Sequence, residues 1–582
     1  MSRYYRFACA VPQVVTADIG YNLSRICQLY SQASDNGAAA VLFPAYALGG
    51  YGCGELDCFQ LFAEQEKIAM TQLAEMTEKY PSLMVFGTSD GRTAVVSEGK
   101  IYFSKSPSTV FTDGKIKISA VYPDRGVCNR VKNCAGAHVM LFPYAQTDTF
   151  HTVKQRRMEY SFLSRMLNCY CIGCGAGAAN STASGVCAGQ ALAAFDGKVT
   201  AESRLFERDE QLFYCDVDPE RAAYIRRKNM EFWDAADQEI CVNLPTVDDL
   251  KYFPVSKYPF IPDDASELSE YAESIIKISA AALANRMVSS RSKKMVIGVS
   301  GGLDSTMALI TCIECCRQLG FSNDAVVAVS MPGFGTSDRT RDNSLAIAKE
   351  FGTLLRYIPI ADAVTGHFKD IGHDLNNTDV VYENSQARER TQILMDIANQ
   401  CNGIVIGTGD LSEIALGWCT YNGDQMSMYA VNASIPKTLM RSVIRHYAEK
   451  CSGVQAEKLI DICDTPVSPE LVPGKQFTEE IIGSYDLHDF FLYNFINYGD
   501  DPEKLFALGC KAFAEDYSSR EILNALEVFF RRFFISQFKR SAMPDAPDVT
   551  GMELGRFAMP SDASGAIWCQ AVSDLKKQIE NQ

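Results

Sequence analysis

Residues 296–310 read VIGVSGGLDSTMALI, an apolar run followed by two glycines and a second apolar run with helical spacing. This pattern predicts a buried strand that ends at Ser300 and a helix that begins near Ser305. Gly301 and Gly302 carry no side chains, so their backbone N–H groups can approach an anion. The N-terminus of the following helix adds the positive end of its dipole. The stretch therefore predicts a phosphate-binding loop between a strand and a helix.

The side chains of this loop fit the same chemistry. Ser300 and Ser305 supply hydroxyl donors around Leu303, and Asp304 is placed to hold Mg²⁺ against the phosphates. An ordinary strand–turn–helix connection is the alternative, because paired glycines are common in turns. The complete S-G-G-x-D-S sequence after a buried strand favours the phosphate loop. The stretch has neither the G-K-[ST] of a Walker A loop nor the G-x-G-x-x-G of a dinucleotide fold.

The chain from about residue 264 alternates short apolar runs with longer segments of helical spacing. This alternation predicts a doubly wound parallel sheet that binds ligands at the carboxyl ends of its strands. The tail from about residue 484 is predicted to be largely helical. The predicted strands are 295–300, 324–333, 354–360 and 403–410, and the helices between them are 303–320, 344–352 and 385–400.

Residues 1–245 show a similar mixture of strand-like and helix-like segments, which predicts a layered α/β sandwich. Residues 246–263 are rich in proline and have little periodicity, so they are predicted to be a linker. We therefore expect domains at 1–245 and 264–582. In the first domain the predicted strands are 6–15, 39–44, 83–91, 100–106, 137–145, 169–179 and 189–199, and the helices are 21–38 and 153–167.

Composition limits the class of protein. The chain has 582 residues, enough for two large domains. Its net charge of −16 argues against a general surface for nucleic acid or anionic membranes. No run approaches the roughly 18 apolar residues of a membrane span, and the N-terminus lacks a secretory pattern. A cytoplasmic protein with locally concentrated cations is expected.

The chain contains 21 cysteines, an unusual number. In a large cytoplasmic protein they are expected to be reduced and mostly buried. Cys169, Cys171 and Cys174 in LNCYCIGCGAGAA form one cluster that could be read as a metal site. Residues of a buried strand are the favoured interpretation, because no second C-x-x-C or histidine pair accompanies them.

The loop at 300–305 resembles the PP-loop of the ATP pyrophosphatases, which split ATP into AMP and pyrophosphate to activate a substrate oxygen. Several stretches further along the chain are similar to NAD⁺ synthetases. The resemblance extends along nearly all of the second domain and implies that deamido-NAD⁺ is adenylated on its nicotinate carboxylate, after which ammonia displaces AMP. These stretches are 383–396 (ENSQARERTQILMD), 407–441 (beginning GTGDLSE), 464–473 (DTPVSPELVP), 538–547 (FKRSAMPDAP) and 557–568 (FAMPSDASGAIW).

The resemblance also implies roles for particular residues. Asp304 and Glu413 correspond to the Mg²⁺ ligands, and Thr408 to a threonine that contacts ATP. Lys437, with Lys539 and Arg540, is a candidate for the triphosphate and the pyrophosphate leaving group. Adenylation brings a carboxylate against ATP, so metal and fixed cations are needed to cancel the repulsion.

A second group of residues is implied to bind deamido-NAD⁺. Trp418 and Asp424 correspond to positions near the nicotinate ring and the incoming ammonia. Further contacts are implied for Asn384, Arg388 and Lys539. Arg388 and Arg390 are two residues apart, so they cannot share one helix face and only one is expected to meet the ligand. Weaker candidates are Arg339 and Arg341.

The first domain resembles the nitrilase-type glutaminase domain of the glutamine-dependent NAD⁺ synthetases, on the stretches YRFACAVPQVVTADIGYN, VLFPAYALGGYGCGEL and FDGKVTAESRLF. That family releases ammonia with a Glu base, a Lys and a Cys nucleophile. Here Ala45 follows F-P in place of the glutamate, and Val121 (or Ser119 under a shifted alignment) stands in place of the cysteine. Lys105 matches the lysine. Alanine cannot accept a proton and valine cannot attack a carbonyl, so this domain is expected to be inactive.

Two nitrogen donors for the amidation are considered, free ammonia and glutamine. Free ammonia is favoured, with the first domain acting as a structural and oligomerising module. Alternatively, a nearby thiol such as Cys53, Cys128 or Cys134 restores the use of glutamine.

Two other function classes are weighed against NAD⁺ synthesis. Another PP-loop enzyme acting on a nucleotide or RNA is disfavoured, because the chain lacks basic stretches and a C-x-x-C pair. A non-catalytic protein that binds ATP or deamido-NAD⁺ is disfavoured by the intact loop with Glu413 and Lys437. The family resemblance implies a homo-oligomer.

Overall fold

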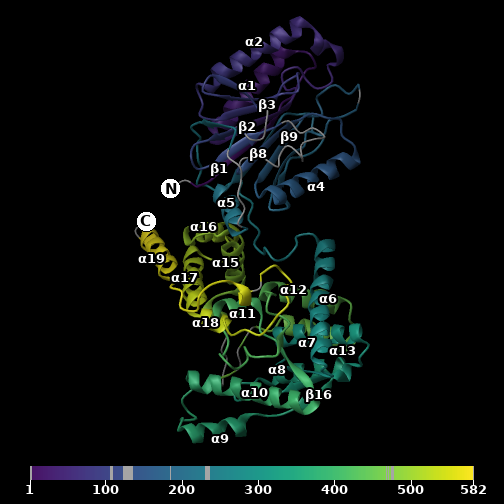
Figure 1. The fold of residues 1–582 in the computed structure, drawn as a ribbon, viewed down its shortest axis with the longest axis vertical. Coiled ribbons are helices and arrows are strands. Elements are labelled where there is room, and N and C mark those ends of the chain that lie inside the picture. The colour runs from purple at the N-terminus through teal and green to yellow at the C-terminus, as the bar shows by residue number, and fades with distance from the viewer. Residues whose placement is uncertain are drawn as a thin grey trace. The chain divides into compact units, whose positions relative to one another are not determined.

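The structure, a computed structural model, describes residues 3–104, 109–121, 136–183, 185–229, 236–466, 468, 471–472, 478–552 and 554–580. The chain forms two compact units, Met1–Pro254 and Val255–Gln582 (Figure 1). The division falls inside the predicted linker at 246–263. Among the helices that the structure describes, none combines the length and apolar character that crossing a bilayer requires.

Unit 1 contains two sheets. The first has the strand order β12-β1-β2-β3-β4-β5, in which β1, β2 and β3 run parallel. The second has the order β11-β10-β9-β8-β7-β6-β13, in which β7, β8 and β9 run parallel. The strands are β1 (Tyr5–Val11), β2 (Ala38–Ala45), β3 (Leu83–Gly87), β4 (Thr93–Ser97), β5 (Lys100–Ser104), β6 (Thr109–Thr112), β7 (Lys117–Ala120), β8 (Val139–Tyr144), β9 (Tyr170–Gly175), β10 (Ala191–Phe195), β11 (Lys198–Glu202), β12 (Gln211–Val217) and β13 (Gln238–Cys241).

Helices cover the outer face of each sheet. Tyr30 of α1 and Leu73 of α2 share an apolar cluster with β2, β3 and β4. Leu163 and Leu167 of α4 share another with β8, β9 and β10. Since β2 also contacts β8 and β9, the two sheets face each other, and the predicted αββα sandwich is confirmed. The helices of this unit are α1 (Ile19–Asp35), η1 (Gly54–Cys58), α2 (Gln60–Thr77), α4 (Phe150–Leu167) and α5 (Pro219–Lys228).

Unit 2 is built on a five-stranded sheet with the order β16-β15-β14-β17-β18, and every neighbouring pair is parallel. Consecutive strands from β14 to β16 move toward one edge, and the chain then crosses to β17 on the other side of β14. Right-handed crossovers in opposite directions place their helices on opposite faces. The predicted doubly wound sheet is therefore confirmed. The strands are β14 (Lys294–Gly298), β15 (Val326–Ser330), β16 (Leu354–Tyr357), β17 (Gly403–Gly407) and β18 (Tyr429–Ala430).

The helices of unit 2 fall into two groups. Among those before residue 465, α7, α8 and α10 contact the sheet, and α9 and α10 share an apolar cluster with β14, β15 and β17. The later ones form the helical tail, coloured yellow-green to yellow in Figure 1. The helices are α6 (Ala265–Ser290), α7 (Leu303–Leu319), η3 (Asn323–Ala325), α8 (Asp338–Glu350), α9 (Ala361–Ile371), α10 (Val380–Cys401), α11 (Leu411–Leu416), α12 (Lys437–Glu449), α13 (Gly453–Cys463), α14 (Thr478–Ile482), α15 (Tyr485–Tyr498), α16 (Pro502–Ala512), α17 (Ser519–Ile535), α18 (Gln537–Arg540), η4 (Leu554–Arg556) and α19 (Ala566–Glu580).

Candidate active site

A cavity of about 620 Å³ opens at the carboxyl ends of β14 and β17. These two strands lie side by side where the strand order reverses. Doubly wound sheets bind ligands at such a reversal, because the loops leaving the two strands separate there. The cavity is lined by the whole loop 298–305 and by Thr408 and Glu413 beyond β17.

The phosphate loop connects β14 to α7. Gly301 has φ +85°, and a Cβ there would lie 2.2 Å from the Thr340 carbonyl oxygen, so only glycine fits. Gly302 is the N-cap of α7 and supplies no capping side chain. The hydroxyls of Ser300 and Ser305 lie 3.2 Å apart. The first N–H groups of α7 thus have no side-chain cap and stand at the cavity.

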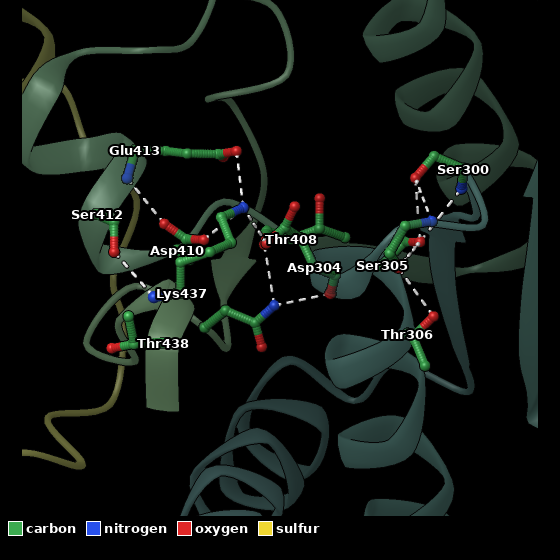
Figure 2. A network of polar contacts seen from close by, with 12 residues as sticks. Ser300, Asp304, Ser305, Thr306, Thr408, Asp410, Ser412, Glu413, Lys437 and Thr438 are labelled. Atoms are coloured by element: carbon green, nitrogen blue, oxygen red, sulfur yellow. Dashed lines mark hydrogen bonds and ion pairs between the residues drawn. The ribbon is translucent and has the colours of Figure 1, made fainter. Parts of the chain in front are cut away.

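Three carboxylates meet one lysine beside this loop (Figure 2). The Nζ of Lys437 lies 2.6 Å from Asp304 Oδ1, 2.6 Å from Asp410 Oδ2 and 3.0 Å from Glu413 Oε1. Lys437 is 1 % exposed, and Asp304 and Glu413 lie between it and the cavity, whose lining includes both carboxylates but not the lysine. The lysine therefore acts on the cavity through the carboxylates that it pairs with.

Burial and mutual proximity shift the ionisation of this cluster. Burial disfavours the charge on Lys437, but the three carboxylates outweigh it and raise the pKa of the lysine well above its usual value. Burial raises the pKa of Glu413 to about 7, against the opposing effect of Lys437. Burial also raises the pKa of Asp410 well above its usual value. Three carboxylates thus share one lysine, with Asp410 and Lys437 buried and Asp304 and Glu413 at the cavity.

Asp410 is a residue that the sequence predictions missed. It is the N-cap of α11, where its Oδ1 accepts a hydrogen bond from the Glu413 N–H at 2.8 Å. It is fully buried, and its second oxygen faces Lys437. The signal was present in DLSE at 410–413, since an aspartate three residues before a glutamate is typical of a helix N-terminus.

The oxygen atoms of this cluster fit a divalent cation. Oxygen ligands of Asp304, Asp410 and Glu413 lie within 4.8 Å of one another. Carboxylate oxygens beside a phosphate site are the ligands that Mg²⁺ takes in proteins. Asn432 connects the start of α7 to the loop after β17, because its Nδ2 donates to the carbonyl oxygens of Asp304 and Thr408, each at 2.9 Å.

The other end of the cavity contains the residues predicted for deamido-NAD⁺. The Asp424 carboxylate accepts a hydrogen bond from the Thr420 N–H at 2.6 Å, and the Thr420 hydroxyl donates to Asn384 at 2.7 Å. Burial raises the pKa of Asp424, against the effect of the Thr420 N–H. The Lys539 ammonium donates to the carbonyl oxygens of Gly417 and Cys419. All of these residues except Gly417 line the cavity.

An aromatic ring forms part of the same wall. Trp418 lines the cavity, and the guanidinium of Arg532 lies 4.9 Å from the centre of its ring. The Arg532 Nε donates to the carbonyl oxygen of Leu416 at 3.0 Å. Arg532 also lines the cavity and is a second residue that the sequence predictions missed.

The arginines correct the sequence predictions in part. Arg540 is 1 % exposed and donates to the carbonyl oxygens of Ile414 and Ala415 at the end of α11, so it is not available to a phosphate. Arg388 and Arg390 both line the cavity, and the expectation that only one of them meets the ligand stays a prediction.

The two weaker candidates, Arg339 and Arg341, lie in the first turn of α8 and differ in their surroundings. Arg341 lines the cavity, whereas Arg339 pairs with Asp461 and is absent from the lining.

In unit 1, the structure describes two of the residues expected at the glutaminase positions, Ala45 and Val121, and both have apolar side chains. Ala45 is the last residue of β2 and is buried in a cluster with Ala145, Ala176 and Cys187, which lie just beyond β8, just beyond β9 and in the loop before β10. Val121 directly follows β7 and is buried. Lys105, Cys128 and Cys134 lie outside the described residues.

Burial acts on two described thiols of this unit, Cys187 in the cluster with Ala45 and Cys53 in the loop after β2. Burial raises the pKa of Cys187 to about 11 and also raises that of Cys53. The Cys53 thiol donates to the carbonyl oxygen of Gly49 at 3.0 Å. Elsewhere in this unit, Cys171 and Cys174 lie in β9 and are buried, as expected for strand residues.

Comparison with known proteins places the chain in a family. The model of the family described as NAD synthase matches residues 275–519. The glutamine-dependent NAD(+) synthetase of Mycobacterium leprae is 30% identical over 100% of this chain and 98% of that protein. The enzyme of the same name from Mycobacterium bovis is 34% identical over 75% of this chain and 71% of that protein. A crystal structure of a glutamine-dependent NAD(+) synthetase from Cytophaga hutchinsonii, 16% identical, aligns over 98% of this chain and 100% of that chain with a TM-score of 0.42. The chain belongs to the family of the glutamine-dependent NAD⁺ synthetases.

Proposed function

We propose that the chain is a ligase that converts deamido-NAD⁺ to NAD⁺, using ATP and free ammonia and releasing AMP and pyrophosphate. The nicotinate carboxylate attacks the α-phosphorus of ATP, and pyrophosphate leaves. Ammonia then attacks the carboxyl carbon of the adenylate, and AMP leaves as the carboxamide forms. The convergence of Asp304, Glu413 and Lys437 beside an uncapped helix N-terminus carries the proposal, because phosphoryl chemistry needs fixed charges at that place.

The residues at the phosphate end bind and align ATP. The N–H groups of Gly301, Gly302 and Leu303 face the phosphates, with Ser300 and Ser305 as further donors. Thr408 contacts the nucleotide from the end of β17. Asp304 and Glu413 hold Mg²⁺, with Asp410 as the third carboxylate of the group. The ion, when bound, neutralises charge on the triphosphate and on the departing pyrophosphate.

Lys437 balances the carboxylates of this end. Its ammonium reduces the repulsion between Asp304, Glu413 and an anionic nucleotide. Direct contact between Lys437 and a phosphate stays a prediction, since the lysine is buried behind the two carboxylates.

The residues at the other end hold the nicotinate half of the substrate. Trp418 offers an apolar face to the ring, and Asn384, Arg388 and Lys539 offer polar contacts. Asp424 is placed to receive a proton from ammonia as the new C–N bond forms, since burial keeps its pKa above that of an ordinary aspartate.

We also propose that ammonia, and not glutamine, is the nitrogen donor. The position of the general base holds Ala45, and Val121 stands where the nucleophile is expected. Burial raises the pKa of Cys53 and of Cys187, which opposes a thiolate at either of these two positions. A homo-oligomer and a cytoplasmic location stay predictions.

Product analysis tests the proposed reaction. The purified chain is incubated with deamido-NAD⁺, ATP, Mg²⁺ and ammonium, and the products are separated by chromatography. We expect NAD⁺, AMP and pyrophosphate in equal amounts. Formation of ADP and phosphate instead, or no conversion of deamido-NAD⁺, contradicts the proposal.

A further inference from the structure

Helix α12 begins at Lys437 without a cap of its own. Its N-cap residue is Pro436, whose side chain has no hydrogen-bond acceptor. The first N–H groups of a helix need acceptors from elsewhere. The Lys437 N–H donates to the Ser412 hydroxyl at 2.8 Å, and the Thr438 N–H donates to Asp489 Oδ2 at 3.0 Å. The start of α12 is therefore held by side chains of α11 and α15.

Asp489 of α15 links these contacts to one another. Its Oδ1 accepts a hydrogen bond from the Ser412 hydroxyl at 2.5 Å, and its Oδ2 also accepts one from the Thr438 hydroxyl at 2.7 Å. The Ser412 hydroxyl thus donates to Asp489 while it accepts from Lys437. One carboxylate fixes residues on both α11 and α12, which are neighbours of Glu413 and of Lys437.

Asp489 is buried, so its carboxylate depends on the hydrogen bonds that it accepts from Ser412 and Thr438. The residue is 2 % exposed, and a buried carboxylate is destabilising unless hydrogen bonds replace its water. Burial raises its pKa to about 6, against the lowering effect of its contacts with Ser412 and Thr438. A neutral acceptor would cap α12 at less cost, whereas this carboxylate accepts hydrogen bonds from both α11 and α12.

We propose that Asp489 is a positioning residue of the phosphate site, which sets Glu413 and Lys437 through Ser412 and Thr438. Through Asp489, the helical tail thereby influences the geometry of the phosphate site, although Asp489 lies outside the cavity. This inference rests on the proposed function in so far as the site is one for Mg²⁺ and ATP. Asp489 itself does not line the cavity, so its effect on ligands is indirect.

The test is the variant Asp489→Asn, with Asp486→Asn as the matched control. The substituted amide would keep one acceptor and place an N–H₂ group against donors on the other side. Asp486 lies on the same helix and contacts Tyr258 at 3.5 Å. We expect Asp489→Asn to weaken the binding of Mg²⁺–ATP by about tenfold or more, as loss of a hydrogen bond to a charged group does, and to leave the affinity for deamido-NAD⁺ unchanged. Equal affinities for Mg²⁺–ATP in the two variants would overturn the inference.

A double-mutant cycle separates positioning from simple helix capping. Ser412→Ala removes the hydroxyl that connects Asp489 to Lys437, so its effect on Mg²⁺–ATP affinity and that of Asp489→Asn should not add. Additive effects, or affinities unchanged while only the melting temperature falls, would contradict positioning. If Asp489→Asn does not fold, Ser412→Ala and Thr438→Val test the same link: each should weaken Mg²⁺–ATP binding, and wild-type affinity in both would overturn it.

The readout also separates this inference from the proposed function. Calorimetric titration with Mg²⁺–ATP needs no turnover. A wild-type chain that binds Mg²⁺–ATP but forms no NAD⁺ defeats the proposed function and leaves the Asp489 comparison decisive. A wild-type chain that binds no Mg²⁺–ATP overturns both.

Discussion

The ammonium group of Lys437 lies 2.6 Å from a carboxylate oxygen of Asp304, across 133 residues of sequence. The first residue begins α12 and the second lies in the first turn of α7. The pair therefore exists only when the sheet of unit 2 has formed and both helices are in place. It joins the phosphate loop to the acidic residues beyond β17.

Asp304→Ala should abolish AMP formation with deamido-NAD⁺. The change removes a carboxylate from the proposed ion site and one of the partners of buried Lys437. We expect the rate to fall by at least about 100-fold, the size typical of losing one preorganised electrostatic group, as measured by AMP release. Asp324→Ala, on an exposed residue before β15, is the control and should keep the wild-type rate. Normal turnover by Asp304→Ala shows that the assignment of the ion ligand is wrong.

Asp410→Asn and Asp410→Ala should differ in stability but not in activity. Asparagine can still cap α11, whereas loss of a cap to alanine costs about 0.5–2 kcal/mol of unfolding free energy. Both variants remove the carboxyl group that pairs with Lys437, so we expect both to slow AMP formation by about tenfold or more. Denaturant unfolding and AMP release measure the two effects. Wild-type activity in Asp410→Asn would show that Asp410 is only a helix cap.

Gly301→Ala should destabilise unit 2, and Gly302→Ala should not. Alanine at Gly301 would take a positive φ and meet the Thr340 carbonyl oxygen at 2.2 Å, whereas the nearest atom to a Cβ at Gly302 is Ser300 Oγ at 3.5 Å. We expect a loss of about 2 kcal/mol or more for the first variant and under about 1 kcal/mol for the second. Denaturant unfolding measures both. Equal stabilities would contradict the close approach of α8 to the loop.

His138 should make unit 1 less stable in acid. Burial lowers its pKa to about 3, and its Nδ1 accepts a hydrogen bond from the Lys117 N–H at 2.9 Å. The unfolded chain binds a proton below about pH 6.5, while the folded unit does not. The contribution is therefore complete above about pH 6.5 and falls by about 1.4 kcal/mol per pH unit between about pH 6.5 and 3.

The variant His138→Asn removes this titration. Denaturant unfolding of unit 1 at about pH 7 and about pH 5 should show the stability difference between wild type and variant shrinking by about 2 kcal/mol at the lower pH. A difference that does not change with pH would show that His138 is not buried in its neutral form.

The sequence predicted the part of the site that is formed by one continuous stretch of the chain. The stretch 296–310 contains the strand, the loop and the helix start together, so local patterns were sufficient. The alternation after residue 264 likewise predicted the parallel sheet. Asp410 was missed although its local signal was present, because its partner Lys437 is 27 residues further on.

Contacts between distant elements could not be predicted in this way. The sequence predicted only that Asp489 lies in a helical tail, because its partners Ser412 and Thr438 lie 77 and 51 residues away. Arg540 was assigned to phosphate because a buried arginine on carbonyl oxygens and an arginine on a phosphate look the same in sequence. Only the packing of α18 against α11 separates them.

The central claim is that unit 2 makes NAD⁺ while unit 1 cannot release ammonia from glutamine. The most direct measurement compares the initial rates of NAD⁺ formation with ammonium and with glutamine, at saturating ATP, Mg²⁺ and deamido-NAD⁺. The account predicts NAD⁺ with ammonium, and with glutamine neither NAD⁺ nor glutamate above the background of the enzyme-free sample. Glutamate released in step with NAD⁺ when glutamine is the nitrogen source would contradict it.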